Sequence, residues 1–202
     1  STTIIAYILH YILFNQSMSV AVLANKQSTA KDILGRLRLA YEYLPKWLQQ
    51  GIIEWNKGSI ELENGSKILA SSTSASAVRG GSYNMIFLDE FAHVPTSIAD
   101  EFFSSVYPTI TSGQTTKVLM VSTPHGLNMF YHYWRGATKE VGEPGKNDYI
   151  PIEVQWTQVP TYPGGPLRDE KWKQETIANT SEDQFKSEFE CDFVGSSATL
   201  IS

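Results

Sequence analysis

The sequence predicts an α/β fold in which helices cover a mainly parallel sheet. Short segments at 20–24, 85–88 and 117–121 are apolar except for Lys117 and are typical of strands buried on both faces. Segments with apolar residues at helical spacing separate these runs. Buried strands that alternate with helices indicate a doubly wound sheet, because parallel strands require crossover connections.

The helical pattern occurs at residues 1–14, 33–44, 98–106 and 127–134, where apolar side chains recur three or four positions apart. The second of these helices is expected to end at Pro45, because proline cannot continue a helix. The first is too short to span a bilayer.

A hairpin is predicted between Ser59 and Ala70. Two strand-like runs flank Asn64 and Gly65 there, and an Asn-Gly pair is typical of a type I′ turn, in which both residues have positive φ. The segment that follows, 71–82, is rich in Ser, Ala and Gly and predicts a loop.

After the helix predicted at 127–134, the regular alternation of strands and helices ends. One further strand is predicted at 150–156, and two short polar helices are predicted at 168–178 and 181–190. A proline- and glycine-rich turn separates the strand from the helices. We therefore predict a core over residues 1–140 and a small lid-like subdomain over residues 141–202.

The composition is that of a globular protein, with 42% hydrophobic and 18% charged residues to build a core and a solvated surface. The formal net charge of −5 does not favour a polyanion, so any contact with nucleic acid needs a local basic patch or a partner. Cys191 is the single cysteine, which excludes an internal disulfide and fits a reducing compartment. The chain begins inside a helical pattern without an initiating Met, and we expect it to be part of a longer protein.

Asp89 and Glu90 directly follow the apolar run at 85–88. Ligands of open parallel sheets bind at the carboxyl ends of the strands. Phosphoryl transfer to water needs a divalent cation on the phosphates and a base near the water, and two successive carboxylates at such an edge suit these two tasks. The alternative is that the pair simply ends a strand.

Three other positions suit the same chemistry. Ser122 and Thr123 follow the run at 117–121, where their hydroxyls either sense a γ-phosphate or cap the strand end. Arg79 lies in a glycine-containing loop, where it either reaches a transferring phosphate or is solvated. Ser1 opens a helix, where it either supplies the cation-binding hydroxyl of a phosphate-binding loop or caps the helix.

Taken in this order, the features resemble the ATPase domain of the large terminase subunit of tailed phages, and the T-even myovirus type above all. The resemblance covers nearly the whole chain, and the stretch 51–66 is its most specific part. The stretches that carry it are 51–66, 77–80, 89–90, 122–131, 184–185, 193–195 and 199–202.

The resemblance implies a three-layer P-loop NTPase core of the additional-strand, RecA-like class, with a small lid subdomain. It implies an ATP-hydrolysing motor that uses Mg²⁺ and drives double-stranded DNA into a procapsid through the portal protein. The implied partners are the DNA, the portal protein, the small terminase subunit and further copies of the chain in a pentameric ring. The implied location is the host cytoplasm, at the procapsid portal, without a membrane.

The resemblance also implies roles for single residues. Asp89 is the expected Walker B ligand of Mg²⁺, Glu90 the catalytic base, and Arg79 the arginine that acts on a neighbouring subunit's nucleotide. Ser1 is the expected Walker A hydroxyl and second metal ligand, and Ser122 and Thr123 belong to the coupling motif. The expected nucleotide-binding residues are Ser1, Thr2, Asp89, Ser122 and Thr123.

Two alternatives stay open at this point. The first is another P-loop DNA translocase or helicase, which the stretch 51–66 disfavours. The second is a non-catalytic, ATPase-like scaffold that binds the portal protein or the small terminase subunit, which the presence of both Asp89 and Glu90 disfavours. Because the phosphate-gripping lysine and the family's nuclease domain lie outside 1–202, we expect this chain alone to bind ATP poorly and not to cut DNA.

Overall fold

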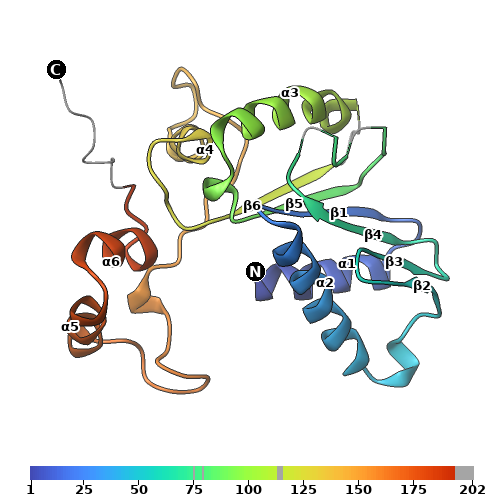
Figure 1. Ribbon diagram of the computed structural model, residues 1–202, viewed down its shortest axis with the longest axis horizontal. Coiled ribbons are helices and arrows are strands. Elements are labelled where there is room, and N and C mark those ends of the chain that lie inside the picture. The colour runs from blue at the N-terminus through green and yellow to red at the C-terminus, as the bar shows by residue number, and fades with distance from the viewer. Residues whose placement is uncertain (75, 79, 113–115, 194–202) are drawn as a thin grey trace. The chain divides into compact units, whose positions relative to one another are not determined.

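Figure 1 shows the computed structural model of the chain, which describes residues 1–74, 76–78, 80–112 and 116–193. The chain forms two compact units, Ser1–Ser122 and Thr123–Ser202. The boundary between the two units therefore follows Ser122, whereas the sequence predicts that the core ends at residue 140. The functional division into 1–140 and 141–202 stays a prediction.

A six-stranded sheet forms the centre of the first unit, in the order β2-β3-β4-β1-β5-β6. β1 pairs in parallel with β4 and β5, β5 pairs in parallel with β6, and β2 and β3 are antiparallel to their neighbours. The mainly parallel α/β sheet predicted from the sequence is confirmed. The strands are β1 Ser19–Ala24, β2 Ile52–Trp55, β3 Ser59–Leu62, β4 Lys67–Ser72, β5 Met85–Asp89 and β6 Lys117–Val121.

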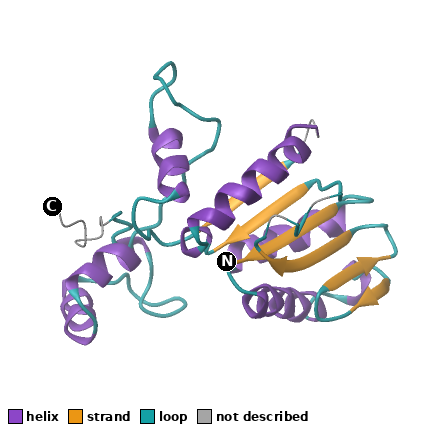
Figure 2. Cartoon of the chain, turned by 45° about the horizontal axis from the view of Figure 1, so that its top comes forward, coloured by secondary structure: helices purple, strands orange, loops and turns teal. Residues whose placement is uncertain are grey.

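Helices cover both faces of this sheet (Figures 1 and 2). On one face, buried side chains of α1 and α2 form a single core with alternate residues of β1, β3, β4 and β5. α3 lies on the other face, so the first unit has the predicted three layers. The helical elements of this unit are α1 Thr2–Phe14, α2 Gln27–Glu42, η1 Lys46–Leu48, η2 Phe91–His93 and α3 Thr96–Ser112. No helix in the described part of the chain is long and apolar enough to cross a membrane.

The alternation of side chains along β5 decides where Asp89 lies. Met85 and Phe87 belong to the core beneath α1 and α2. Residues two apart in a strand share a face, so Asp89 ends the strand on the α1 side. The register pairs Asp89 with Ala24 of β1 and with Val121 of β6, which brings the carboxyl ends of these parallel strands to one edge.

The β3–β4 hairpin is confirmed, but the predicted type I′ turn is wrong. Gly65 has a φ of +80°, whereas Asn64 is absent from the described non-glycine residues with positive φ. The Gly65 N–H donates to the Leu62 carbonyl at 2.9 Å, as in a type I turn followed by a left-handed glycine. The amide of Asn64 instead donates to the carbonyls of Ile12 at 2.7 Å and Asn15 at 3.2 Å, which ties the turn to the end of α1.

The second unit is mainly helical, with α4 Met129–Thr138, η3 Trp156–Gln158, α5 Glu170–Asn179 and α6 Glu182–Phe189. The three α-helices confirm the sequence patterns. The strand predicted at 150–156 is wrong, because no strand of the described chain includes these residues. Ile150 and Ile152 are 86% and 80% exposed there. Their β-branched side chains favour extended backbone, but a strand also needs a neighbour that completes its hydrogen bonds.

Candidate active site

Ser1 and Asp89 meet at the carboxyl edge of the sheet. Asp89 is buried, with 3% of its surface exposed, and its carboxylate accepts a hydrogen bond from Ser1 Oγ at 2.7 Å. Ser1 is the N-cap residue of α1, yet its side chain makes no capping hydrogen bond. The hydroxyl is therefore directed at the carboxylate rather than at the helix backbone, and it offsets part of the cost of burying that carboxylate.

This pair of oxygens fits Mg²⁺. A hydroxyl and one carboxylate are hard ligands, and Mg²⁺ commonly takes one or two carboxylates together with water and substrate phosphates. Within the described residues there is no cluster of three or more His, Cys, Asp or Glu side chains that could enclose a metal by themselves.

The first turn of α1 adds an anion-attracting feature beside Asp89. The first N–H groups of a helix have no partner within the helix, and the helix dipole makes this end positive. Thr2 is exposed in this turn, and the helix proper begins where the Ile5 N–H donates to the Ser1 carbonyl at 3.0 Å. Phosphate oxygens bind readily at such a terminus.

Glu90 leaves the sheet abruptly. Its backbone has φ 53° and ψ 40°, a left-handed conformation that costs a non-glycine residue about 1 kcal/mol. The next residues form η2, and the Glu90 carboxylate Oε2 lies 3.5 Å from His93 Nε2. Strain of this kind is often kept at functional sites. Glu90 is 39% exposed at its side chain, so solvent reaches a carboxylate that directly follows the buried Asp89.

Ser122 contacts the turn that follows Glu90. Its Oγ accepts a hydrogen bond from the Ala92 N–H at 3.1 Å, which connects the end of β6 to η2. Ser122 is the last residue of the first compact unit and Thr123 the first of the second, so the chain passes between units at these two positions.

Arg79 lies outside the described residues. The β4–β5 loop that contains it begins at the same carboxyl edge, because β4 runs parallel to β1. There, the N–H and the hydroxyl of the buried Thr73 both donate to the Ala24 carbonyl, at 2.8 Å and 3.1 Å. Gly80 follows Arg79 with a φ of +79°.

The sequence patterns did not indicate that His93 belongs to the candidate site. The four histidines are scattered and show no metal-ligand spacing. The one feature that could have indicated it is its position three residues after Glu90. This spacing brings the two side chains together only because the left-handed Glu90 starts a short helical turn. A strand that continued past Asp89 would have carried the two side chains apart.

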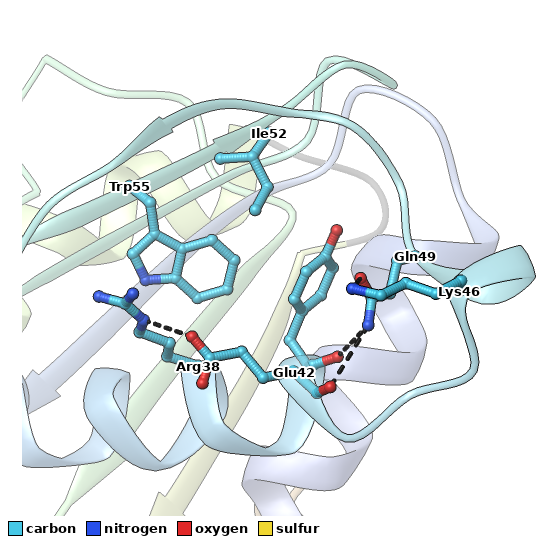
Figure 3. Close-up of a pocket in the computed structure, with 7 residues that line it drawn as sticks. Arg38, Glu42, Lys46, Gln49, Ile52 and Trp55 are labelled. Atoms are coloured by element: carbon cyan, nitrogen blue, oxygen red, sulfur yellow. Dashed lines mark hydrogen bonds and ion pairs between the residues drawn. The ribbon is translucent and has the colours of Figure 1, made fainter.

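A separate pocket of about 240 Å³ lies between the C-terminal half of α2 and β2 (Figure 3). Tyr41 and Trp55 form part of its wall, with ring centroids 5.1 Å apart. Burial, and to a smaller degree Glu63, raises the pKa of Tyr41, whose hydroxyl donates to the Gln50 carbonyl. The lining residues are Arg38, Tyr41, Glu42, Lys46, Gln49, Ile52 and Trp55.

This pocket is distinct from the site of Ser1 and Asp89. β2 forms the edge of the sheet opposite to β6. Arg38 Nε donates to Glu42 at 2.8 Å, and the Gln49 amide donates to the Leu44 carbonyl at 2.9 Å near the end of α2. Its polar groups thus serve the end of a helix, and we assign it no part in phosphate chemistry.

Comparison with known proteins agrees with the sequence resemblance. The Escherichia phage T5 large terminase subunit is 32% identical over 193 residues, which cover 94% of this chain and 40% of that protein. The large terminase subunit of Thermus virus P23-45 is 31% identical over 130 residues, covering 62% of this chain and 26% of that protein. The chain thus spans less than half the length of these relatives.

Solved structures share the fold. A mutant of the Thermus phage P74-26 large terminase ATPase domain matches with a TM-score of 0.71 and 19% identity, over 95% of this chain and 83% of that one. The HK97 bacteriophage large terminase matches with a TM-score of 0.66 and 18% identity, over 92% and 43%. The large terminase of a thermophilic bacteriophage, in complex with ADP, matches with a TM-score of 0.62 and 10% identity, over 94% and 44%.

The sequence profile described as "Terminase large subunit, T4likevirus-type, N-terminal" matches residues 1–202. Because that match extends over the whole sequence, the chain belongs to the N-terminal region of the T4-like family of large terminase subunits.

Proposed function

We propose that this chain carries the catalytic edge of an ATPase that drives double-stranded viral DNA into a procapsid. The observation that carries the proposal is the hydrogen bond of Ser1 to the buried Asp89, with Glu90 next in the chain. Membership of the large terminase family supports the same function. A scaffold without catalysis would gain nothing from a buried carboxylate at this edge, since burial is costly.

Asp89 and Ser1 would hold Mg²⁺ through the carboxylate and the hydroxyl, once the cation replaces the hydrogen bond between them. The bound cation would neutralise charge on the phosphate oxygens. The N–H groups of the first turn of α1, including that of Thr2, would bind phosphate oxygens at the positive end of the helix. These contacts would orient the terminal phosphate towards the partly exposed Glu90.

Glu90 would act as the base. As its carboxylate takes a proton from water, the water oxygen forms a bond to the γ-phosphorus, and the bond from that phosphorus to the bridging oxygen breaks. The products are ADP and inorganic phosphate. Ser122 and Thr123, at the junction of the two compact units, would link this step to movement of the chain.

The proposed setting is the procapsid portal in the host cytoplasm. There, copies of the chain would form a ring, expected to be a pentamer, with the portal protein and the small terminase subunit as partners. Residues 1–140 would form the motor core and 141–202 the lid. Arg79 of one subunit would reach the nucleotide of the next, so Arg79→Ala should lower turnover only in the assembled ring. Unchanged turnover would make Arg79 an ordinary solvated arginine.

The direct test replaces Glu90 with glutamine in the full-length protein. Glu90→Gln should retain ATP binding and lose both ATP hydrolysis and DNA packaging into purified procapsids, because glutamine keeps the shape of glutamate but cannot accept the proton. The matched control is Glu101→Gln, on the exposed surface of α3. Wild-type turnover of Glu90→Gln would refute the role of Glu90.

The same preparation distinguishes a packaging motor from a helicase. A packaging motor moves the duplex intact, so the wild-type protein should consume ATP during uptake of double-stranded DNA without separating its strands. Strand separation in the absence of procapsids would favour the helicase alternative.

A further inference from the structure

Glu90 needs more than its place in the sequence to act as a base. Its side chain is 39% exposed, whereas a base must keep one carboxylate oxygen at the attacking water. The residues that restrict this side chain therefore bear on catalysis. They lie in the turn formed by Glu90 and η2 and in the elements that contact it.

The backbone of this turn is held on two sides. Phe91 and Ala92 are each only 2% exposed, and the ring of Phe91 packs edge-on against Phe103 of α3 with centroids 5.5 Å apart. On the other side, Ser122 Oγ of β6 accepts the Ala92 N–H at 3.1 Å. The turn is thus fixed to one helix and to one strand end.

The imidazole of His93 returns from this turn towards Glu90. The His93 N–H donates to the Glu90 carbonyl at 3.0 Å, which closes the turn and keeps residues 90 and 93 close together. His93 Nε2 lies 3.5 Å from Glu90 Oε2. Catalytic contacts are often long in unliganded proteins and shorten when substrate binds.

We propose that His93 is a positioning residue that orients the carboxylate of Glu90, within a turn that Ser122 anchors to β6. This inference rests on the proposed role of Glu90 in hydrolysis. It assigns Ser122 an indirect action, through the Ala92 N–H, in place of direct contact with phosphate. Since β6 leads into the second compact unit at Ser122, a shift of that strand end would reorient Glu90 through one hydrogen bond.

The test measures steady-state ATP hydrolysis by the full-length protein assembled on procapsids. His93→Ala should lower kcat about tenfold with little change in KM, because a loosely held base misses the water while ATP binding is retained. His93→Gln should restore kcat to within about threefold of wild type, since its amide N–H can still donate to Glu90. The matched control is His10→Ala, an exposed histidine of α1.

Three further variants test the hydrogen bond by which Ser122 anchors the turn. Ser122→Ala should lower kcat, Ser122→Thr should restore much of it, and the double variant of His93→Ala with Ser122→Ala should lose less than the product of the two single effects. Such non-additivity is expected of residues that act through one group. Independent effects would remove Ser122 from the proposal, and a change in KM alone would refute the positioning role of His93.

Failure of this inference is distinguishable from failure of the proposed function. If Glu90→Gln abolishes hydrolysis and His93→Ala leaves kcat unchanged, the base is retained and the positioning role is refuted. If Glu90→Gln keeps wild-type turnover, the proposed function itself fails. Equal melting temperatures of the His93 variants and wild type establish that lost turnover is not lost folding.

Discussion

Ser1 at the catalytic edge and Asn64 at the hairpin use their polar side chains in opposite ways. At the catalytic edge, Ser1 Oγ contacts Asp89 through side-chain atoms alone. At the hairpin, the Asn64 amide donates to the carbonyls of Ile12 and Asn15, and its oxygen accepts the Ser66 N–H at 3.0 Å. A contact between side chains can be exchanged for a ligand atom. A contact to backbone is lost only when the backbone moves.

The difference teaches where stability and chemistry are separable. The hairpin contacts hold α1, which presents Ser1 to Asp89, so they support the site from its far end. We therefore expect substitutions at the catalytic edge to change turnover with little effect on stability, and substitutions at the hairpin to change stability with little effect on turnover per folded molecule.

The largest expected effect is at Asp89. Asp89→Asn should lower kcat by about a hundredfold or more, because a metal on the phosphates contributes several kcal/mol to the transition state. The amide has the same size, so urea unfolding should stay within about 1 kcal/mol of wild type. Asp32→Asn on the exposed face of α2 is the matched control. A large loss of stability with unchanged kcat would contradict the expectation that the catalytic edge affects turnover more than stability.

The next effect is at Asn64. Asn64→Ala removes three hydrogen bonds to backbone, and at about 0.5–1.5 kcal/mol each we expect a loss of about 2 kcal/mol in the free energy of unfolding. Urea denaturation measures this loss. Turnover, corrected for the folded fraction, should match wild type. A lower corrected turnover would mean that the hairpin also controls the geometry of Ser1 and Asp89.

Ser1 allows a smaller test from the catalytic side. Ser1→Ala in the full-length protein removes one of two proposed Mg²⁺ ligands while Asp89 remains, so the Mg²⁺ concentration for half-maximal hydrolysis should rise about tenfold. Ser1→Thr keeps the hydroxyl and serves as the control. Equal Mg²⁺ dependence of all three proteins would limit Ser1 to a partner of the buried carboxylate.

Residue patterns predicted β1 and β5, where burial is nearly continuous, whereas β6, also predicted as a buried strand, is only partly buried. The fully buried β5 stands out as an apolar run, and Asp89 at its end follows from that run. No strand was predicted over β2, because the adjacent Ile52 and Ile53 do not follow the alternation of apolar and polar residues that marks a half-buried strand. Both side chains are exposed in the structure. The strand predicted at 150–156 failed for the converse reason: its residues favour extended backbone, but pairing depends on a neighbour that local sequence does not specify.

The sequence indicated single residues of the candidate site, but it did not indicate which of them contact one another. Ser1 and Asp89 are 88 positions apart, and no spacing rule joins them; the resemblance to a family supplied the connection. The role of the turn at Glu90 was not predictable from residue type, because glutamate rarely adopts positive φ. His93 becomes informative only once that conformation brings its ring to within 3.5 Å of the Glu90 carboxylate.

The smallest expected effect compares a glycine from each region. Gly65 in the hairpin and Gly80 in the β4–β5 loop have φ of +80° and +79°, so alanine at either should cost about 1 kcal/mol. A Cβ at Gly65 would lie 3.0 Å from Ser17 Oγ, whereas one at Gly80 would meet nothing within 4 Å. Urea unfolding should therefore show the larger loss for Gly65→Ala. If only Gly80→Ala lowers turnover, the loop beside Arg79 behaves like the catalytic edge. Equal turnover and equal losses of stability in the two variants would contradict the difference between catalytic edge and hairpin.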